Sequence, residues 1–193
     1  MYGEYAWWGY YRKDYPCKET LLGERNDMIQ RHPKTVFICP HVGSRADCPD
    51  LAADDLAALP NLYYDISARM PLLGMSDRRA EHARTLLIEY ADRILFGSDS
   101  IYDDTNVPAG VQAQCLLQPY EIPLEGADPR ERYVETSVEF LRSNLDFLLT
   151  DTIQTDPPFK RNRSGFSIRG LGLPKEVCEK LLYKNIEKIL SKG

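Results

Sequence analysis

Apolar residues between positions 18 and 100 follow two alternating patterns. Three short and nearly continuous apolar runs predict strands buried on both faces, at Thr35–Cys39, Leu62–Ile66 and Ile94–Phe96. Apolar residues at helical spacing predict a helix before each run: from about Lys18 until Pro33 stops it, over Asp50–Leu59, and from Asp77, which we expect to cap its helix. Units of this length predict a parallel sheet with right-handed crossovers.

The pattern changes after Ser100. Four prolines and the lack of a clear period predict a long loop over Ile101–Pro129, followed by an amphipathic helix over Arg130–Leu149. A polar link to Arg163 precedes a last helix, which has Pro174 in its first turn. We predict a single domain over residues 1–193, made of an aromatic lead (1–17), helix and strand units (18–100), and a long loop with C-terminal helices (101–193).

Composition limits the classes of function. The fractions of 43% hydrophobic and 27% charged residues are typical of a soluble globular protein. The net charge of −5 comes from interspersed acids and bases, which predicts a small-molecule partner rather than nucleic acid or a membrane. The oligomeric state stays open, a homo-oligomer included. Five cysteines without C-x-x-C pairing and the lack of a secretory signal predict a reducing, cytoplasmic location.

Two side chains that can carry chemistry follow predicted strands. His41 comes after the first strand in "TVFICPHVG", and Asp99 comes after the third in "RILFGSDS". The carboxyl ends of parallel strands form one rim, where α/β proteins bind ligands, so we expect both residues at the same site. Imidazole and carboxylate are the ligands and the acid–base groups of metal-assisted hydrolysis, in which the metal lowers the pKa of its bound water to about 7.

Each candidate residue also has a purely structural interpretation. His41 could donate a hydrogen bond in a turn, and Asp99 could cap a helix. We expect Asp65 to be structural and to pair with nearby backbone or an arginine. Arg69 fits either a surface salt bridge or a clamp for a substrate carboxylate. His82 lies among charges on a predicted helix, and we expect it to be solvated.

Four segments together resemble the carboxyl-terminal half of amidohydrolase-related proteins of the amidohydrolase-2 group. The segments are "ERNDMIQRHPKTVFICPHVG", "LPNLYYDISAR", "DRILFGSDS" and "GLGLPKEVCEKLLYKNIEKIL". Their order and spacing match the family over most of residues 18–100 and 165–191. The resemblance is specific for the family and leaves the substrate open.

The resemblance implies an α/β fold, a partial (β/α)₈ TIM barrel with covering helices and a C-terminal helical extension. The three predicted strands would be barrel strands six to eight. His41 would match the histidine that binds the metal or activates water, and Asp99 the aspartate that is both a metal ligand and the proton shuttle. Arg69 falls where relatives often bind an acidic group of the substrate. The implied cofactor is a divalent metal ion, zinc by expectation.

The sequence departs from the family pattern in its histidines. The family also needs a His-x-His after its first strand and a histidine after its fifth, whereas this chain has three histidines and no His-x-His. We therefore expect an N-terminally truncated barrel domain that is inactive by itself. Its open sheet edge predicts a marginally stable or aggregation-prone polypeptide.

Three functions fit these observations. The first is a metal-dependent hydrolase that acts on C–N or C–O bonds of a small molecule. The second is a metal-dependent decarboxylase of the same superfamily, which a contact from Arg69 to a substrate carboxylate would favour. The third is a non-catalytic α/β module in which His41 and Asp99 are relics.

Overall fold

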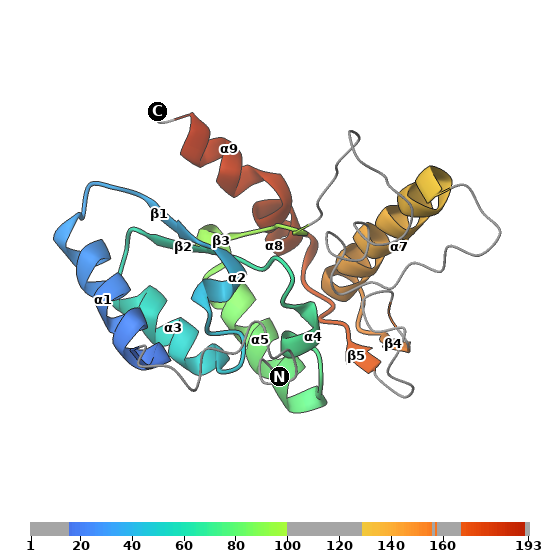
Figure 1. Cartoon of the computed structure of the whole chain (residues 1–193), viewed down its shortest axis with the longest axis horizontal. Coiled ribbons are helices and arrows are strands. Elements are labelled where there is room, and N and C mark those ends of the chain that lie inside the picture. The colour runs from blue at the N-terminus through green and yellow to red at the C-terminus, as the bar shows by residue number, and fades with distance from the viewer. Residues whose placement is uncertain (1–15, 100–128, 156, 158–166, 192–193) are drawn as a thin grey trace.

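A parallel sheet of three strands forms the centre of the protein. The structure is a computed structural model that describes residues 16–99, 129–155, 157 and 167–191. The strands lie in the order β1 (Phe37–Cys39), β2 (Leu62–Asp65) and β3 (Ile94–Leu95), as Figure 1 shows. Phe37 pairs with Leu62, and Tyr64 pairs with Ile94. The predicted α/β class, with three parallel strands in chain order, is confirmed.

A helix precedes each strand, as the apolar spacing predicts. These helices are α1 (Lys18–Arg31), α3 (Pro49–Ala58) and α5 (Asp77–Glu89). The cap of α5 differs from the prediction, because Ser76 and not Asp77 is the N-cap: its extended backbone lets its hydroxyl accept the Arg79 N–H at 3.3 Å. A further short helix, α4 (Met70–Leu73), lies between β2 and α5.

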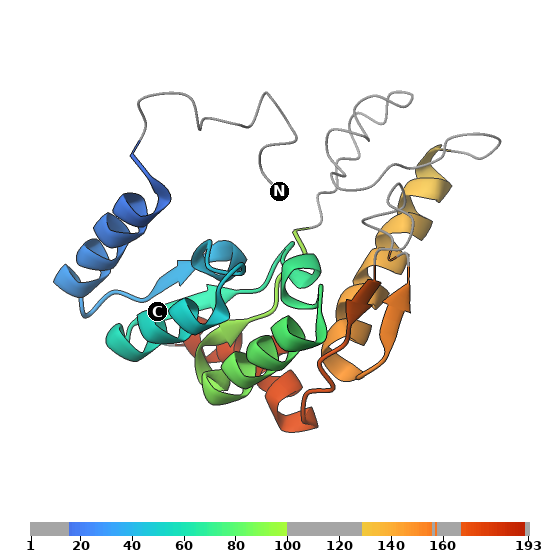
Figure 2. The same cartoon turned by 90° about the horizontal axis from the view of Figure 1, so that it is seen from below.

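The C-terminal part adds helices and a small antiparallel pair of strands. The helix α7 (Pro129–Leu149) confirms the predicted amphipathic helix, and α7 and α1 lie at opposite ends of the molecule (Figures 1 and 2). The strands β4 (Ile153–Thr155) and β5 (Ser167–Arg169) pair antiparallel, so part of the predicted polar link is a strand. The last helix confirms its prediction and consists of α8 (Lys175–Glu179), a π-helical turn η3 (Lys180–Lys184) and α9 (Asn185–Leu190). Of the described helices, none is both long enough and apolar enough to cross a membrane.

Two predicted segments cannot be compared with the structure. The aromatic lead over residues 1–15 lies outside the described residues, and so does the predicted loop between residues 100 and 128.

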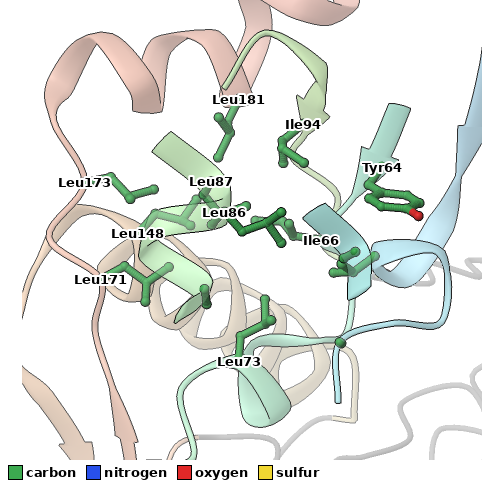
Figure 3. Packing of buried hydrophobic residues seen from close by; sticks show 14 of the residues in the cluster. Tyr64, Ile66, Leu73, Leu86, Leu87, Ile94, Leu148, Leu171, Leu173 and Leu181 are labelled. Atoms are coloured by element: carbon green, nitrogen blue, oxygen red, sulfur yellow. The ribbon is translucent and has the colours of Figure 1, made fainter. Parts of the chain in front are cut away.

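The hydrophobic core lies between the sheet, α5 and the C-terminal elements. Figure 3 shows Leu86 and Leu87 of α5 near its centre, with Ile94 and Leu181 beside them. Leu87 and Ile94 are both fully buried. Leu148 of α7 and Ile168 of β5 belong to the same cluster, so the C-terminal part shares one core with the sheet.

The two outer edges of the sheet differ. At β3, the Phe96 N–H donates to the Leu181 carbonyl of η3 at 2.8 Å, and the Asn185 amide donates to the Ile94 carbonyl at 2.8 Å. At β1, no strand of the described part pairs with the outer edge, and Val36 and Ile38 are 46% and 42% exposed. The prediction that all three strands are buried on both faces is therefore wrong for β1, because the face that carries Ile38 is exposed to solvent.

Candidate active site

Left-handed backbone follows the carboxyl end of every strand of the parallel sheet. In the described ranges, the non-glycine residues with positive φ are His41, Val42, Ser44, Ala68 and Asp99. The first three follow β1, Ala68 follows β2, and Asp99 follows β3. Such conformations cost energy for residues with a Cβ, and they cluster at active sites and ligand clamps. The rim that the sequence predicts as the site is thus also where backbone strain is concentrated.

The segment after β1 is a left-handed turn, His41–Ser44, and forms most of the short element α2 (Pro40–Gly43). Its φ values are 61° at His41, 56° at Val42, 55° at Gly43 and 63° at Ser44. A left-handed residue costs roughly 1–2 kcal/mol when it carries a Cβ, and Val42 is also β-branched. Surrounding contacts must therefore hold the turn in place.

His41 is anchored to the end of β2 through both its backbone and its ring. The His41 N–H donates to Asp65 Oδ1 at 2.9 Å. The ring atom Nδ1 lies 2.9 Å from the Ser67 carbonyl oxygen and 3.0 Å from Ser67 Oγ. The structural role predicted for Asp65 is confirmed, because its Oδ1 also accepts the N–H and the hydroxyl of Ser67, at 3.0 and 2.6 Å.

These contacts decide which ring nitrogen of His41 carries the proton. A carbonyl oxygen can only accept, and the Ser67 hydroxyl donates its one hydrogen to the Asp65 carboxylate. Nδ1 must therefore be the donor, so in the neutral ring Nε2 carries the lone pair. The half-buried imidazole can act as a base or as a ligand through Nε2 alone.

The sequence reasoning missed Ser67, although a signal for it exists. Asp65 and Ser67 are two residues apart at the end of a strand, where side chains alternate between faces. A residue two positions after a candidate acid therefore points to the same side of the sheet, and here it is the residue that binds the His41 ring.

Asp99 lies at the same rim but does not contact His41. It is exposed, with φ 62°, and it follows Gly97, whose added Cβ would lie 3.0 Å from Ser67 Cβ and 3.6 Å from Asp65 Cγ. The chain after β3 therefore runs directly past Asp65 and Ser67. Within the described part, Asp99 forms no hydrogen bond or ion pair with His41.

Arg69 follows β2 in the same region. It is half-buried, and its Nη1 donates to the Ala68 carbonyl at 3.0 Å. Among the described residues it forms no ion pair, so the predicted surface salt bridge is absent from this part of the chain.

A network of charged and polar side chains lies beneath the left-handed turn. Its centre is Asp55 of α3, whose carboxylate is 2.6 Å from Arg25 Nη2 and 3.0 Å from the Tyr64 hydroxyl. Burial alone would raise the pKa of Asp55, but hydrogen bonds from Asn26 and Tyr64 and the charge of Arg25 hold this pKa below its ordinary value. Burial also raises the pKa of Tyr64. Asp55 is therefore ionised and Tyr64 protonated at neutral pH.

The described residues do not by themselves make a metal centre. They contain no group of three or more His, Cys, Asp and Glu side chains that could hold an ion. His82, which we expected to be solvated, has a side chain that is 34% exposed, and its Nδ1 also lies 3.1 Å from Asp50 Oδ1 between α5 and α3. It contributes no ligand to the rim.

A hollow of about 930 Å³ lies elsewhere, between α5 and the segment around β5. Its lining includes Asp77, Arg84, Asp151 and Arg169, and none of the predicted site residues. Its lining holds three acids (Asp77, Glu81 and Asp151) and two arginines, so its charge selects no particular class of ligand.

Comparisons with known proteins identify the family of the chain. A sequence model described as amidohydrolase matches residues 10–192. Two solved structures, both of an amidohydrolase from Burkholderia multivorans, one with bound HEPES and one with bound zinc, are 16% and 15% identical to the chain, with TM-scores of 0.40 and 0.39. Each alignment covers 90% of this chain and 50% of the other, so the chain spans about half the length of these proteins. No curated protein matches the chain. Because the sequence model covers nearly the whole chain, the protein belongs to the amidohydrolase family.

Proposed function

We propose that this chain supplies His41 and Asp99 to a hydrolytic site that acts on a C–N or C–O bond of a small molecule. The observation that carries the proposal is the backbone at the sheet rim. In the described part, every non-glycine residue with positive φ lies just after β1, β2 or β3, and two of these residues are His41 and Asp99. Strain that is concentrated at one ligand-binding edge supports a functional site there.

The chemistry follows from the protonation of His41. Because its Nδ1–H is bound to Ser67, the lone pair on Nε2 can take a proton from an attacking water. Asp99 is exposed at the same rim, and its carboxylate would pass the proton taken from that water on to the leaving group. A positioned acid or base of this kind contributes typically about 10²–10⁴-fold to a rate.

We also propose that the active enzyme requires a divalent metal ion and a complete (β/α)₈ barrel. A catalytic zinc site usually has three protein ligands, whereas the predicted site residues offer one imidazole and one carboxylate. The described residues therefore do not fit a complete metal site, and we assign no step to a metal ion. The three parallel strands are proposed as strands six to eight of a (β/α)₈ barrel, in a cytoplasmic protein.

Arg69 is proposed to bind an acidic group of the substrate. Its half-buried guanidinium donates to its neighbour Ala68 and forms no ion pair with described residues, which leaves planar donors for a carboxylate. The same observation favours the second candidate function, decarboxylation, since a decarboxylase must bind the carboxylate that it removes.

The test uses the protein as its native cells make it, recovered through an affinity tag added after Gly193. Amide, ester and lactone substrates are assayed for hydrolysis, and carboxylic acids are assayed for release of carbon dioxide. We expect His41→Gln and Asp99→Asn each to lose about 10²–10⁴-fold in kcat/KM. The matched controls His82→Gln and Asp92→Asn should keep wild-type rates, because their contacts with Asp50 and Lys180 lie away from the rim.

Two results would overturn the proposal. Turnover that survives in both site variants would move the chemistry elsewhere. A protein that binds no stoichiometric metal, is not stabilised by zinc and turns over none of these substrates would be a non-catalytic module. Release of carbon dioxide without hydrolysis would instead support the decarboxylase.

A further inference from the structure

One arginine of the buried network around Asp55 also binds the left-handed turn (His41–Ser44). Arg25 of α1 donates from Nη1 to the Gly43 carbonyl at 2.6 Å. Its other terminal nitrogen, Nη2, pairs with Asp55 at 2.6 Å. One guanidinium thus joins the turn to a carboxylate on α3, and its fixed planar geometry determines where Gly43 lies.

The aromatic ring of Tyr64 also packs against Gly43. A Cβ built on Gly43 would lie 2.2 Å from Tyr64 Cε1 and 2.6 Å from Arg25 Nη1, so the backbone of Gly43 fits closely between these two side chains. Tyr64 is fully buried, and the Arg25 guanidinium carbon lies 5.9 Å from the centre of its ring. The position of the turn is therefore set by packing as well as by hydrogen bonding.

A second arginine, Arg45, binds the same carboxylate through its side chain, and it contacts the turn only through its backbone. Its N–H donates to the Val42 carbonyl at 2.9 Å, a bond that a change of side chain leaves in place. Arg45 donates from Nε to Asp55 at 3.3 Å, and its Nη1 pairs with Glu19 at 2.8 Å. The side chains of Arg25 and Arg45 are similarly buried, 15% and 10% exposed. Of these two side chains, only that of Arg25 bonds to Gly43. Substitution of Arg45 therefore serves as a control for substitution of Arg25.

We propose that Arg25 is a positioning residue that keeps the His41 ring in its Nδ1–H form by clamping Gly43. Three non-glycine residues of the turn are left-handed, at roughly 1–2 kcal/mol each, so the turn relaxes if the clamp is lost. Relaxation moves His41, which begins the turn, away from the Ser67 carbonyl that holds its Nδ1–H. The ring then becomes a mixture of two tautomers, and Nε2 is no longer reserved for chemistry.

The proposed function is needed only to give the position of the His41 ring a role in catalysis. The position of the ring can be measured without substrate or metal. A failed clamp and a failed hydrolase assignment therefore give different results.

The experiment reads the tautomers of the histidine rings by long-range ¹H–¹⁵N correlation spectra at about pH 8.5, where imidazole in model peptides is neutral. The chain has three histidines, so the spectrum of His41→Gln assigns the His41 signals. We expect the wild type and Arg45→Met to show Nδ1–H at His41. We expect Arg25→Met to lose this single-tautomer pattern.

Two further variants keep the test decisive. Tyr64→Phe removes the hydroxyl bond to Asp55 but keeps the ring beside Gly43, and we expect it to keep Nδ1–H. If circular dichroism shows that Arg25→Met does not fold, Arg25→Lys replaces it, because an ammonium cannot hold Gly43 and Asp55 at once in planar geometry. Retention of Nδ1–H in the folded Arg25 variant overturns the proposal, as does an equal loss in the Arg45 variant.

Discussion

The Nδ1 atom of His41 lies 2.9 Å from the carbonyl oxygen of Ser67, and this contact joins the ends of two neighbouring strands. Because a carbonyl cannot donate, the contact assigns the ring proton to Nδ1. The Asp65 carboxylate stabilises this contact, because it accepts hydrogen bonds from the His41 N–H and from the Ser67 hydroxyl. The orientation of the imidazole is thus a property of the fold and needs no ligand.

The Asp65 carboxylate should matter more to stability than the Ser67 hydroxyl. Asp65 Oδ1 accepts three hydrogen bonds, so Asp65→Ala, which removes this acceptor, should lower the free energy of unfolding by about 1–3 kcal/mol. Ser67→Ala should cost less and should keep the Nδ1–H tautomer, because the backbone carbonyl remains. Urea denaturation and the histidine spectra check the two variants. A larger loss of stability in Ser67→Ala would contradict this ranking.

Two glycines should respond in opposite ways to alanine. At Gly43, with φ 55°, the new Cβ would lie 2.2 Å from the Tyr64 ring, so Gly43→Ala should destabilise the protein. Overpacking of this kind costs about 1–3 kcal/mol. Gly23 lies exposed in α1 with no atom within 4 Å of its added Cβ. Gly23→Ala should therefore stabilise by about 0.5–1 kcal/mol. Thermal unfolding of the two variants should shift in opposite directions, and an unchanged or raised midpoint for Gly43→Ala would rule out the clamp geometry.

The stability contributed by Asp55 should depend on pH. Its pKa is lower in the folded protein than its ordinary value, so the folded state favours the ionised form. This contribution is complete above the ordinary aspartate pKa of about 3.9 and is lost as the pH falls through the folded value. The difference in unfolding free energy between wild type and Asp55→Asn should therefore shrink on acidification. A constant difference between pH 7 and acid would show that the charge of Asp55 does not matter.

Asn185 should be needed to hold β3. Its buried amide donates to the Ala91 carbonyl at 2.7 Å and to the Ile94 carbonyl at 2.8 Å. Asn185→Asp has almost the same shape but places a carboxylate against two acceptors, so it should destabilise more than Asn185→Ala. Each unsatisfied carbonyl costs about 1–3 kcal/mol, which urea denaturation can resolve. Ser191→Ala on the exposed end of the same helix serves as the control and should change little.

The exposed edge of β1 should promote self-association. Ile38 is 42% exposed on a strand whose outer edge is unpaired within the described part of the chain, and such edges template pairing with other chains. Ile38→Lys should reduce concentration-dependent association in light scattering. Leu190→Lys removes a side chain that is 72% exposed on α9, and it should leave association unchanged. Equal effects would indicate general hydrophobicity rather than the strand edge.

The sequence by itself determined the alternation of helices and strands and the residues that follow the strands. Local periodicity fixes these features, because an apolar face repeats every two residues in a strand and every 3.6 in a helix. This is why the strand that begins at Leu62, the helix from Lys18 and the place of His41 could all be predicted. The wrong cap of α5 was an error of one residue, within the range over which local signals act.

Only the tertiary structure decided the partners of His41. Ser67 is 26 residues away in the chain, and Arg25 is 18 residues from Gly43. No local pattern encodes such contacts, because they depend on how neighbouring strand ends and α1 come together. The left-handed turn likewise could not be predicted from the sequence of residues 41–44, since a β-branched residue such as Val42 rarely adopts this backbone unless surrounding packing enforces it. Local sequence thus identifies the chemical groups of the site, whereas their orientation depends on contacts that form only when the sheet and its helices are assembled.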